Sequence, residues 1–135
     1  MKRITLILLF IGVSIILFAQ DNFDEYLQRA NMGDVEAQYC LGLCYEDGNG
    51  VERDYVKAGY WYKRAAEKGN IKAQTAIGFI YEKGKGVEKN YAEAIYWYKK
   101  AAEQGDVKVQ TYLGCLYYMG QAIDKDYSQA FQRLD

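Results

Sequence analysis

The feature that most constrains the fold is a sequence repeat with a period of 36 residues. The stretch WYKRAAEKGN, residues 61–70, recurs as WYKKAAEQGD, residues 97–106. Residues 34–69 match residues 70–105 at 19 of 36 positions without a gap, and residues 106–135 form an incomplete third copy. A period of 20–50 residues is typical of arrays in which each unit buries its apolar face against the next. We therefore predict a stack of similar units.

Each unit contains two stretches in which apolar residues recur at helical spacing. In the first unit, helix A is expected over about 35–47 and helix B from Tyr55 onward. The apolar stripes consist of Ala37, Leu41, Cys44 and Tyr45 in helix A, and of Tyr55, Ala58, Tyr62 and Ala65 in helix B. Residues spaced in this way form one face of an amphipathic helix. The sequence thus predicts an all-α fold, an α-solenoid of antiparallel helix pairs with 36-residue repeats.

The expected helix ends carry the same residue types in every unit. A glycine followed by Asp or Asn joins the units at 33–34, 69–70 and 105–106. Glycine adopts the left-handed conformation that ends a helix, and Asp or Asn caps the helix that follows. Within each unit, a loop joins helix A to a second cap, which begins helix B. The loop carries a branched apolar residue that is expected to pack against the core. The loop residues are Val51, Val87 and Ile123, and the caps are Asp54, Asn90 and Asp126.

Gly42, Gly78 and Gly114 lie in the middle of helix A in the three units. Glycine at such a position costs about 0.5–1 kcal/mol relative to alanine. Because this cost recurs, we expect a recurring benefit, the close approach of a neighbouring backbone. Trp61 and Trp97 also recur at the period, and they are expected to pack between units.

The first 20 residues differ from the rest of the chain. MKR is basic, and residues 4–19 are nearly all apolar and uncharged. A basic start followed by an apolar run and a small residue is typical of a secretory signal, and the run is shorter than the roughly 20 residues of a membrane span. We predict a signal peptide over 1–20 with cleavage near Ala19, which would place the protein in the periplasm or outside the cell. A retained N-terminal anchor with membrane association is the alternative.

The two ends of the array differ in how they are expected to be covered. Residues 21–33 align with the end of a helix B and are predicted to form an N-terminal capping helix. At the other end, the third helix B begins at Tyr127 and stops short of the unit's length. Arrays normally need a polar cap. Three explanations stay open for that end: a truncated chain, a bound partner, or self-association.

Composition and motifs argue against several classes of function. The formal net charge of −1 and the lack of histidine give no basic field for nucleic acid and no common metal ligand or general base. The loops GNGVER and GKGVEK lack the GK[ST] of a phosphate-binding loop. Cys40 and Cys44 align with apolar residues and are expected to pack, and no CxxC pair supports a zinc site. No cofactor, metal or catalytic residue is predicted.

The pattern AQxxLGxxYxxGxGVxxDYxxAxxWYxxAAExG, as it stands in residues 37–69, resembles the Sel-1-like repeat, a branch of the tetratricopeptide-like α-solenoids. The resemblance covers nearly all of residues 34–135. It implies helix pairs stacked in a right-handed superhelix. It also implies a role as an adaptor or scaffold for protein complexes, often at membranes or in bacterial envelopes, with no common catalytic site.

Some cysteine-rich secreted relatives in this family have been linked to penicillin binding. Those relatives pair a cysteine near the start of helix A with one near the end of helix B. The matching positions here are Gln38 with Ala66 and Gln74 with Ala102. The disulfide pattern is therefore absent, and the resemblance gives that functional link little support.

Residues that are identical in every unit hold an array together, so function is expected where the units differ. One such strip lies on helix A, on the face expected to line the inner curve. Its residues are Tyr39, Leu43 and Glu46, then Thr75, Phe79 and Glu82, then Thr111, Cys115 and Tyr118. Tyrosines of this kind are enriched at interfaces. We predict a groove with an acidic edge at Glu46 and Glu82 that binds an extended or helical peptide with basic flanks. The alternative is that the strip packs against the next helix or is merely exposed.

These observations predict an exported, non-enzymatic scaffold or adaptor that binds a protein or peptide partner. The alternative is a small hydrolase, or a binder of cell-wall-like or lactam substrates, which rests on the family resemblance alone.

Overall fold

The five helices that follow the first one begin where the sequence places Asp or Asn. A computed structural model describes residues 2–123, with side chains up to residue 120, and over this range it contains six α-helices and no strand. The helices are α1 (Lys2–Asn31), α2 (Val35–Asp47), α3 (Tyr55–Glu67), α4 (Ile71–Lys83), α5 (Tyr91–Glu103) and α6 (Val107–Ile123). The predicted all-α class is thereby confirmed.

Five predicted caps bind the backbone of the helix that they begin. Asp34, Asp54, Asn70, Asn90 and Asp106 accept hydrogen bonds of 2.8–3.1 Å from the N–H groups three residues further along. Such a bond satisfies a donor that has no partner inside the helix. The sixth predicted cap, Asp126, and the third helix B lie outside the described residues.

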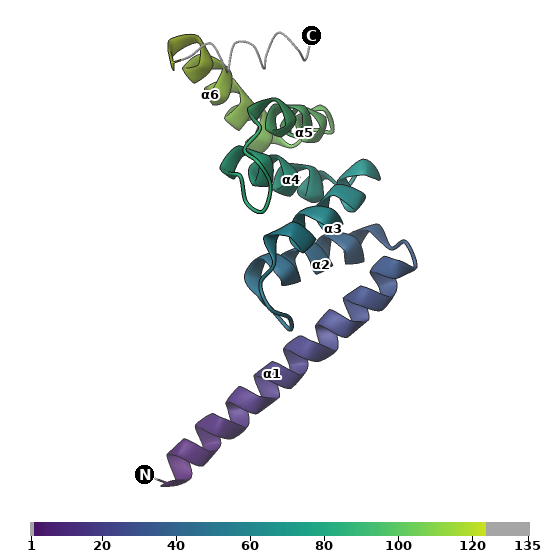
Figure 1. Cartoon of the computed structure of the whole chain (residues 1–135), viewed down its shortest axis with the longest axis vertical. Coiled ribbons are helices and arrows are strands. Elements are labelled where there is room, and N and C mark those ends of the chain that lie inside the picture. Colours follow the sequence, from purple (N-terminus) through teal and green to yellow (C-terminus); the bar gives the residue numbers. More distant parts are fainter. Residues whose placement is uncertain (1, 124–135) are drawn as a thin grey trace.

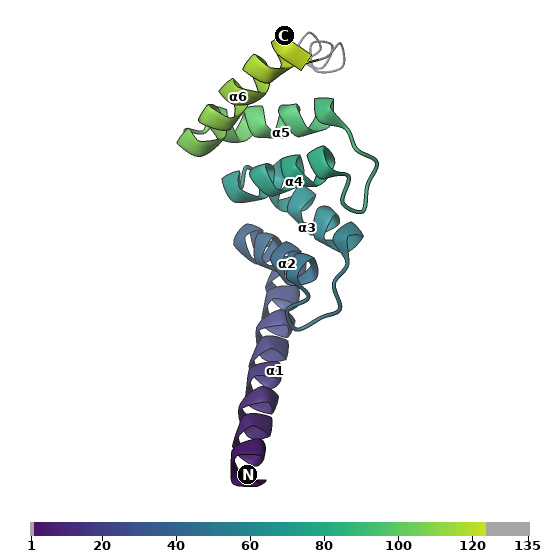
Figure 2. The ribbon, with the colours of Figure 1, turned by 90° about the vertical axis from the view of Figure 1, so that its left-hand side faces the viewer.

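The joints between units are as short as the glycine positions predict. Gly69 has a φ of 91°, in the left-handed region, and the cap Asn70 follows directly. The chain therefore reverses within a few residues, and consecutive helices pack against one another along the whole stack (Figure 1). The longer loops after α2 and α4 lie along the same edge of the stack (Figure 2).

The third unit departs from the predicted pattern. By the repeat, helix A should end near Met119 and a loop should carry Ile123, but α6 runs on through Ile123. In the earlier loops the second glycine, Gly50 or Gly86, has a positive φ. Ala122 occupies that position in the third unit. Ala122 removes the second left-handed position, but α2 and α4 end at the first loop glycine, Gly48 or Gly84, and the third unit keeps that residue as Gly120. The exchange at position 122 therefore does not by itself explain the longer helix.

The core runs along the stack and is built from the predicted stripes. Small alanines alternate with large side chains, so that helices approach closely and the rings fill the remaining space. Fully buried examples are Ala58, Tyr62, Ala65, Ala73, Ile77, Ile80 and Tyr98, with Trp61 and Trp97 nearly so.

The mid-helix glycines make room for an aromatic ring rather than chiefly for a backbone. A Cβ atom on Gly42 would overlap the ring of Tyr62, and one on Gly78 would lie 2.7 Å from Tyr98 Cε1. The expected backbone approach exists only as a second contact, because that Cβ would also lie 3.2 Å from the Ala94 carbonyl oxygen. In the first two units the benefit is therefore the burial of one tyrosine ring, whereas a Cβ on Gly114 would meet no described atom within 4 Å.

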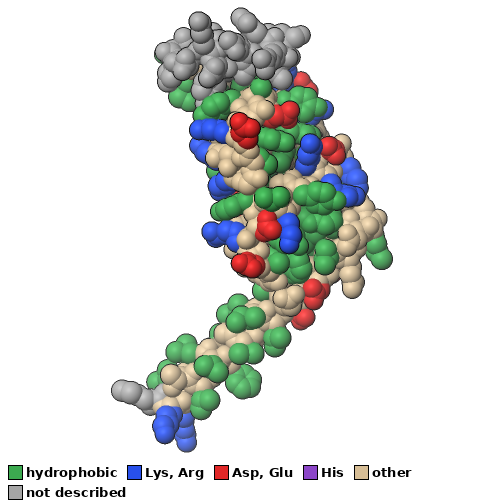
Figure 3. Space-filling view, viewed as in Figure 1, with side chains coloured by type: hydrophobic (Ala, Val, Ile, Leu, Met, Phe, Trp, Pro, Cys, Tyr) green, Lys and Arg blue, Asp and Glu red, His purple; other side chains and the backbone are tan. Residues whose placement is uncertain are grey.

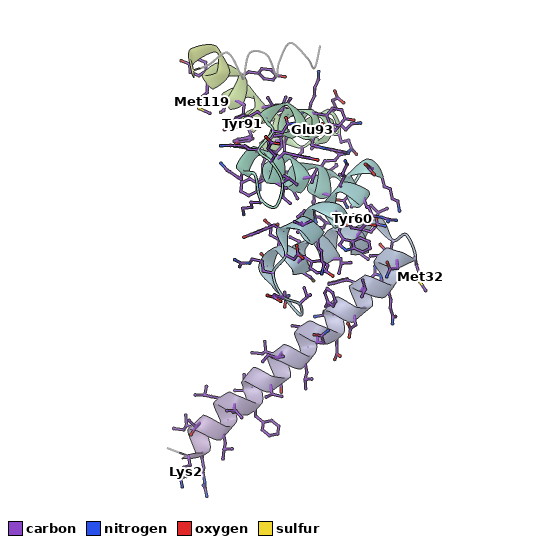
Figure 4. All side chains as sticks on the ribbon, viewed as in Figure 1. Lys2, Met32, Tyr60, Tyr91, Glu93 and Met119 are labelled. Atoms are coloured by element: carbon purple, nitrogen blue, oxygen red, sulfur yellow. The ribbon has the colours of Figure 1, made fainter. Side chains whose placement is uncertain are left out.

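The first helix joins two segments that were predicted separately. The segment 1–20 and the capping segment 21–33 share the continuous 30-residue helix α1. Phe23 and Ala30, both within the segment predicted to cap the array, are buried. The preceding apolar part projects away from the repeats, with exposed hydrophobic side chains along it and basic ones at its tip (Figure 3). Lys2 begins α1 and Met32 directly follows its last residue (Figure 4).

By its length and composition α1 is able to cross a membrane. An 18-residue window of it has a mean hydropathy of 2.2, and none of that window is buried. A signal sequence near the N-terminus has the same properties, so both the predicted cleavage and the alternative anchor agree with this helix.

Candidate partner-binding groove

A groove of about 510 Å³ opens on the face made by α2, α4 and α6. Three of the nine predicted residues line it, namely Tyr39, Thr75 and Phe79. The other lining residues are Lys72, Ala76, Lys83, Tyr98, Lys108, Val109 and Tyr112. The helix A array therefore forms a concave surface that draws side chains from all three units.

Aromatic side chains give the groove a large apolar surface. Phe79 remains 37% exposed, and Tyr39 is half-buried with its ring centroid 5.8 Å from that of Tyr62. Tyr98 and Tyr112 meet edge to face, with ring centroids 5.4 Å apart. Rings held in this way lose little conformational entropy on binding, which suits them as anchors for a partner.

The other predicted residues take different places. Leu43 is half-buried and packs against the core. Thr111, Cys115 and Tyr118 are exposed on α6 outside the groove lining, and Tyr118 is 78% exposed. The strip on helix A is thus split between groove, core edge and open surface.

Glu82 differs most from its predicted place. It was expected at an exposed acidic edge, but only 7% of it is exposed. Its carboxylate accepts hydrogen bonds from Tyr98 over 2.8 Å and from Tyr112 over 2.7 Å. Buried charges in proteins require such partners. Glu82 is therefore an internal acceptor that joins α4 to α5 and α6.

Glu46 has the same role in the first unit. It accepts a 2.6 Å hydrogen bond from Tyr62 and lies 3.7 Å from the Nζ of Lys85. Burial, followed by the hydrogen bond to the carboxylate, raises the pKa of Tyr62, and the same causes raise the pKa of Tyr98. Both hydroxyls consequently remain protonated donors at neutral pH.

The rim of the groove is basic, which corrects the predicted acidic edge. Lys72, Lys83 and Lys108 line the groove, and none of the lining residues that the structure describes is a carboxylate. Lys85 adjoins it, with its Nζ 4.9 Å from the centroid of the Phe79 ring. Lysine stems cover apolar surface while the ammonium group stays in water, so these residues add positive charge beside the aromatic rings.

Two buried glutamines have a role that the sequence reasoning missed. Gln38 and Gln74 are almost completely buried, and each donates a 3.1 Å hydrogen bond to the carbonyl oxygen eight residues earlier. Gln110 repeats the bond to Ala102 over 2.9 Å. Each bond links one unit to the helix before it. The sequence does contain an indication of this role, because a glutamine recurs every 36 residues, and in the first two units it directly follows a buried alanine.

The cysteines behave as packing residues where they are enclosed. Cys44 is buried, and burial raises the pKa of its thiol. Cys40 is half-buried, Cys115 is exposed, and all three are free thiols. Among the described residues no group of three or more His, Cys, Asp or Glu side chains is placed to hold a metal ion.

Comparison with known structures gives close matches over most of the chain. A Sel1 repeat protein from Oxalobacter formigenes matches with a TM-score of 0.73 and 39% identity over 84% of this chain and 47% of that one. A protective antigen of uropathogenic Escherichia coli strains that displays an SLR fold matches with a TM-score of 0.71 and 41% identity, covering 79% of this chain and 23% of that one. Cysteine rich protein B of Helicobacter pylori matches with a TM-score of 0.63 and 26% identity over 66% of this chain and 67% of that one.

Sequence comparison points the same way. The Sel1-repeat-containing protein YbeQ of Escherichia coli K12 is 44% identical over 46 residues, which are 33% of this chain and 14% of YbeQ. The chain thus spans less than half the length of YbeQ and of the first two structural relatives. The Sel1 repeat matches three times in tandem, at residues 35–70, 71–106 and 107–132, one residue later than the predicted frame. The chain belongs to the Sel1 repeat family, whose members are generally scaffolds for protein–protein interaction.

Proposed function

We propose that this protein is a scaffold that binds a protein or peptide partner in the groove on α2, α4 and α6. The observation that carries the proposal is the groove itself, about 510 Å³ in volume and lined by residues of all three units. A cavity of this size accommodates several side chains of an extended segment. Binding of this kind is non-covalent and involves no catalysed reaction. The groove presents its side chains at fixed spacing to a partner.

The groove is supported by bonds that hold its walls in place. Tyr98 and Tyr112 both line the groove, and both donate to the buried carboxylate of Glu82. A hydrogen bond to a charged group is stronger than one between neutral groups. The aromatic walls are therefore fixed before a partner arrives, which reduces the entropy lost on binding.

The apolar N-terminal segment supports a site of action in the cell envelope. Hydrophobic side chains on every side of residues 4–18 are exposed, and a helix that is apolar all round belongs in lipid or in the export machinery. We infer that this segment directs the chain to the membrane and that the repeats act in the periplasm or outside the cell.

A pair of single variants tests the groove. The full chain, extracted in mild detergent, serves as bait for envelope proteins, and a captured partner is then purified and titrated against each variant. Phe79→Asp places a charge on an exposed ring inside the groove, while Tyr60→Asp does the same at a 53% exposed ring on α3. Circular dichroism verifies that both variants keep their helices.

The proposal predicts that Phe79→Asp loses the partner and that Tyr60→Asp retains it. Equal binding by Phe79→Asp and the unchanged chain would show that the partner docks elsewhere.

A further inference from the structure

The lysines that line the groove give it a positive charge, which bears on the kind of partner that it fits. We propose that it binds an acidic peptide segment, with carboxylates at Lys72 and Lys108 and an apolar side chain against Phe79. This inference rests on the proposed function of the same groove and adds the chemical class of the partner.

Lys72 and Lys108 provide the positive charge that is available to a ligand. They occupy equivalent positions in successive units, 36 residues apart, and both side chains are exposed. Among the described residues neither forms an ion pair. Lys72 lies beside an aromatic face, with its Nζ 5.9 Å from the centroid of the Tyr39 ring. Two unpaired cations therefore line one groove.

The carboxylates near the groove are outside its lining or engaged by other side chains. Glu36, at the position of Lys72 and Lys108 in the first unit, is exposed beside the lining and accepts a 3.1 Å hydrogen bond from Asn70. Glu82 is buried behind Tyr98 and Tyr112, and its only cationic neighbour among the described residues is Lys83, at 3.4 Å. Glu46 lies outside the lining and is paired with Lys85. Among the described residues, the groove lining thus offers ammonium groups and rings but no carboxylate.

The positive charge is local, because the chain as a whole has a formal net charge of −1. Local complementarity of this kind determines specificity and the rate of association more than overall affinity. It disfavours basic segments, which would meet repulsion at both lysines.

The rings favour a peptide over other polyanions. Phe79, Tyr39 and Tyr112 offer apolar surface within the groove, which apolar side chains bury on binding. A nucleic acid needs a broad basic surface for its phosphates. The positive charge in this groove comes from three lysines, Lys72, Lys83 and Lys108, set among aromatic rings.

A selection experiment tests the charge of the ligand. A random peptide library is displayed and selected on the full chain in detergent micelles, and individual selected peptides are titrated by fluorescence. We expect enrichment of Asp and Glu around an aromatic or branched residue. Binding should weaken steeply with salt, since the screening length falls to about 3 Å at 1 M ionic strength.

A matched pair of double variants assigns the charge to the groove. Lys72→Glu/Lys108→Glu should weaken the selected peptides about tenfold or more, as reversal turns two attractions into repulsions. Lys63→Glu/Lys99→Glu changes the same residue type at the same spacing on α3 and α5, outside the groove lining, and should leave affinity unchanged.

The outcomes separate this inference from the proposal on which it rests. The proposal of an acidic ligand would be wrong if the selected peptides were neutral or basic, or if the two double variants lost affinity equally. Either result would leave the groove as the proposed binding site. Peptides that bind Phe79→Asp as well as the unchanged chain, or a library that yields no binder, would overturn the groove and the acidic ligand together.

Discussion

The hydroxyl of Tyr98 in α5 donates a 2.8 Å hydrogen bond to Oε2 of Glu82 in α4. The pair recurs one unit earlier, where Tyr62 donates to Glu46 over 2.6 Å. In both units the ring of the same tyrosine covers the mid-helix glycine. One tyrosine therefore joins the two helices of its unit twice, through its ring and through its hydroxyl.

Removal of the Tyr98 hydroxyl should destabilise the array. Tyr98→Phe keeps the ring over Gly78 but leaves the buried Glu82 with one tyrosine donor in place of two. We expect the free energy of unfolding to fall by about 1–3 kcal/mol, measured by urea unfolding and circular dichroism. Tyr60→Phe, at an exposed ring, is the control and should change little. Equal losses in the two variants would contradict the role of this bond.

Stability should decline at alkaline pH because of the same tyrosines. The folded chain raises the pKa of Tyr62 and Tyr98 above the ordinary value of 10.0, chiefly through burial. Above about pH 10 the unfolded chain loses these protons first, so their contribution is complete below that pH and is lost as the pH rises further. Tyr62→Phe/Tyr98→Phe should be less stable at neutral pH and should lose less stability between about pH 9 and pH 11. Parallel pH profiles for the two proteins would refute this assignment.

Two glycines on facing helices should respond in opposite ways to alanine. Gly42→Ala forces a methyl group into the ring of Tyr62, and we expect a loss of about 1–3 kcal/mol. At Gly59 the same methyl group would meet the side chains of Ile77 and Ile80 at 3.9–4.0 Å, an ordinary contact. Gly59→Ala should therefore stabilise by about 0.5–1 kcal/mol through helix propensity. Thermal unfolding of both variants provides the comparison, and a shift of the same sign would be inconsistent with this packing.

A substitution of Lys68 should improve the joint between the first two units. Gln104 donates to the buried Oε1 of Gln74 over 2.8 Å, while the equivalent oxygen of Gln38 is buried without a hydrogen-bond partner. Lys68 occupies the position of Gln104 in the first unit. Lys68→Gln should supply the missing donor and stabilise by about 0.5–1.5 kcal/mol in urea unfolding. Lys63→Gln is the control for the loss of a positive charge. An equal rise in its free energy of unfolding would contradict the new hydrogen bond to Gln38 as the cause.

The mature chain is predicted to begin at Gln20. Cleavage near Ala19 would leave the part of α1 that contains Phe23 and Ala30, which are buried against the repeats. Mass spectrometry of the protein isolated from envelope fractions should give the mass of residues 20–135, in the fraction released without detergent. The mass of the full chain in the membrane fraction would instead establish the anchor.

The sequence was sufficient for the parts of the fold that local chemistry determines. Caps such as Asp34 and joint glycines such as Gly69 act within a few residues of themselves, so a single repeat reveals them. The period then placed the helices, and it located Tyr39, Thr75 and Phe79 on the face where the groove lies.

The parts that were missed depend on contacts between helices. Glu82 falls on the predicted strip, yet hydroxyls from α5 and α6 reach it and enclose it, which the spacing along one helix does not reveal. The groove rim is basic where an acidic edge was predicted, and the cause is the same. The burial of Glu82 leaves lysines as the charged residues that line the groove. The extension of α6 is also invisible to the repeat, because Gly120 matches Gly48 and Gly84, at which α2 and α4 end, yet α6 continues past it.

The most direct test of the account is photo-crosslinking from inside the groove in intact cells. A photoreactive phenylalanine analogue is placed at position 79 in one strain and at position 60 in another, each in the full chain. If the groove holds the partner, position 79 gives a discrete crosslinked partner and position 60 gives none. A partner crosslinked from position 60 alone would contradict the groove as the site of binding.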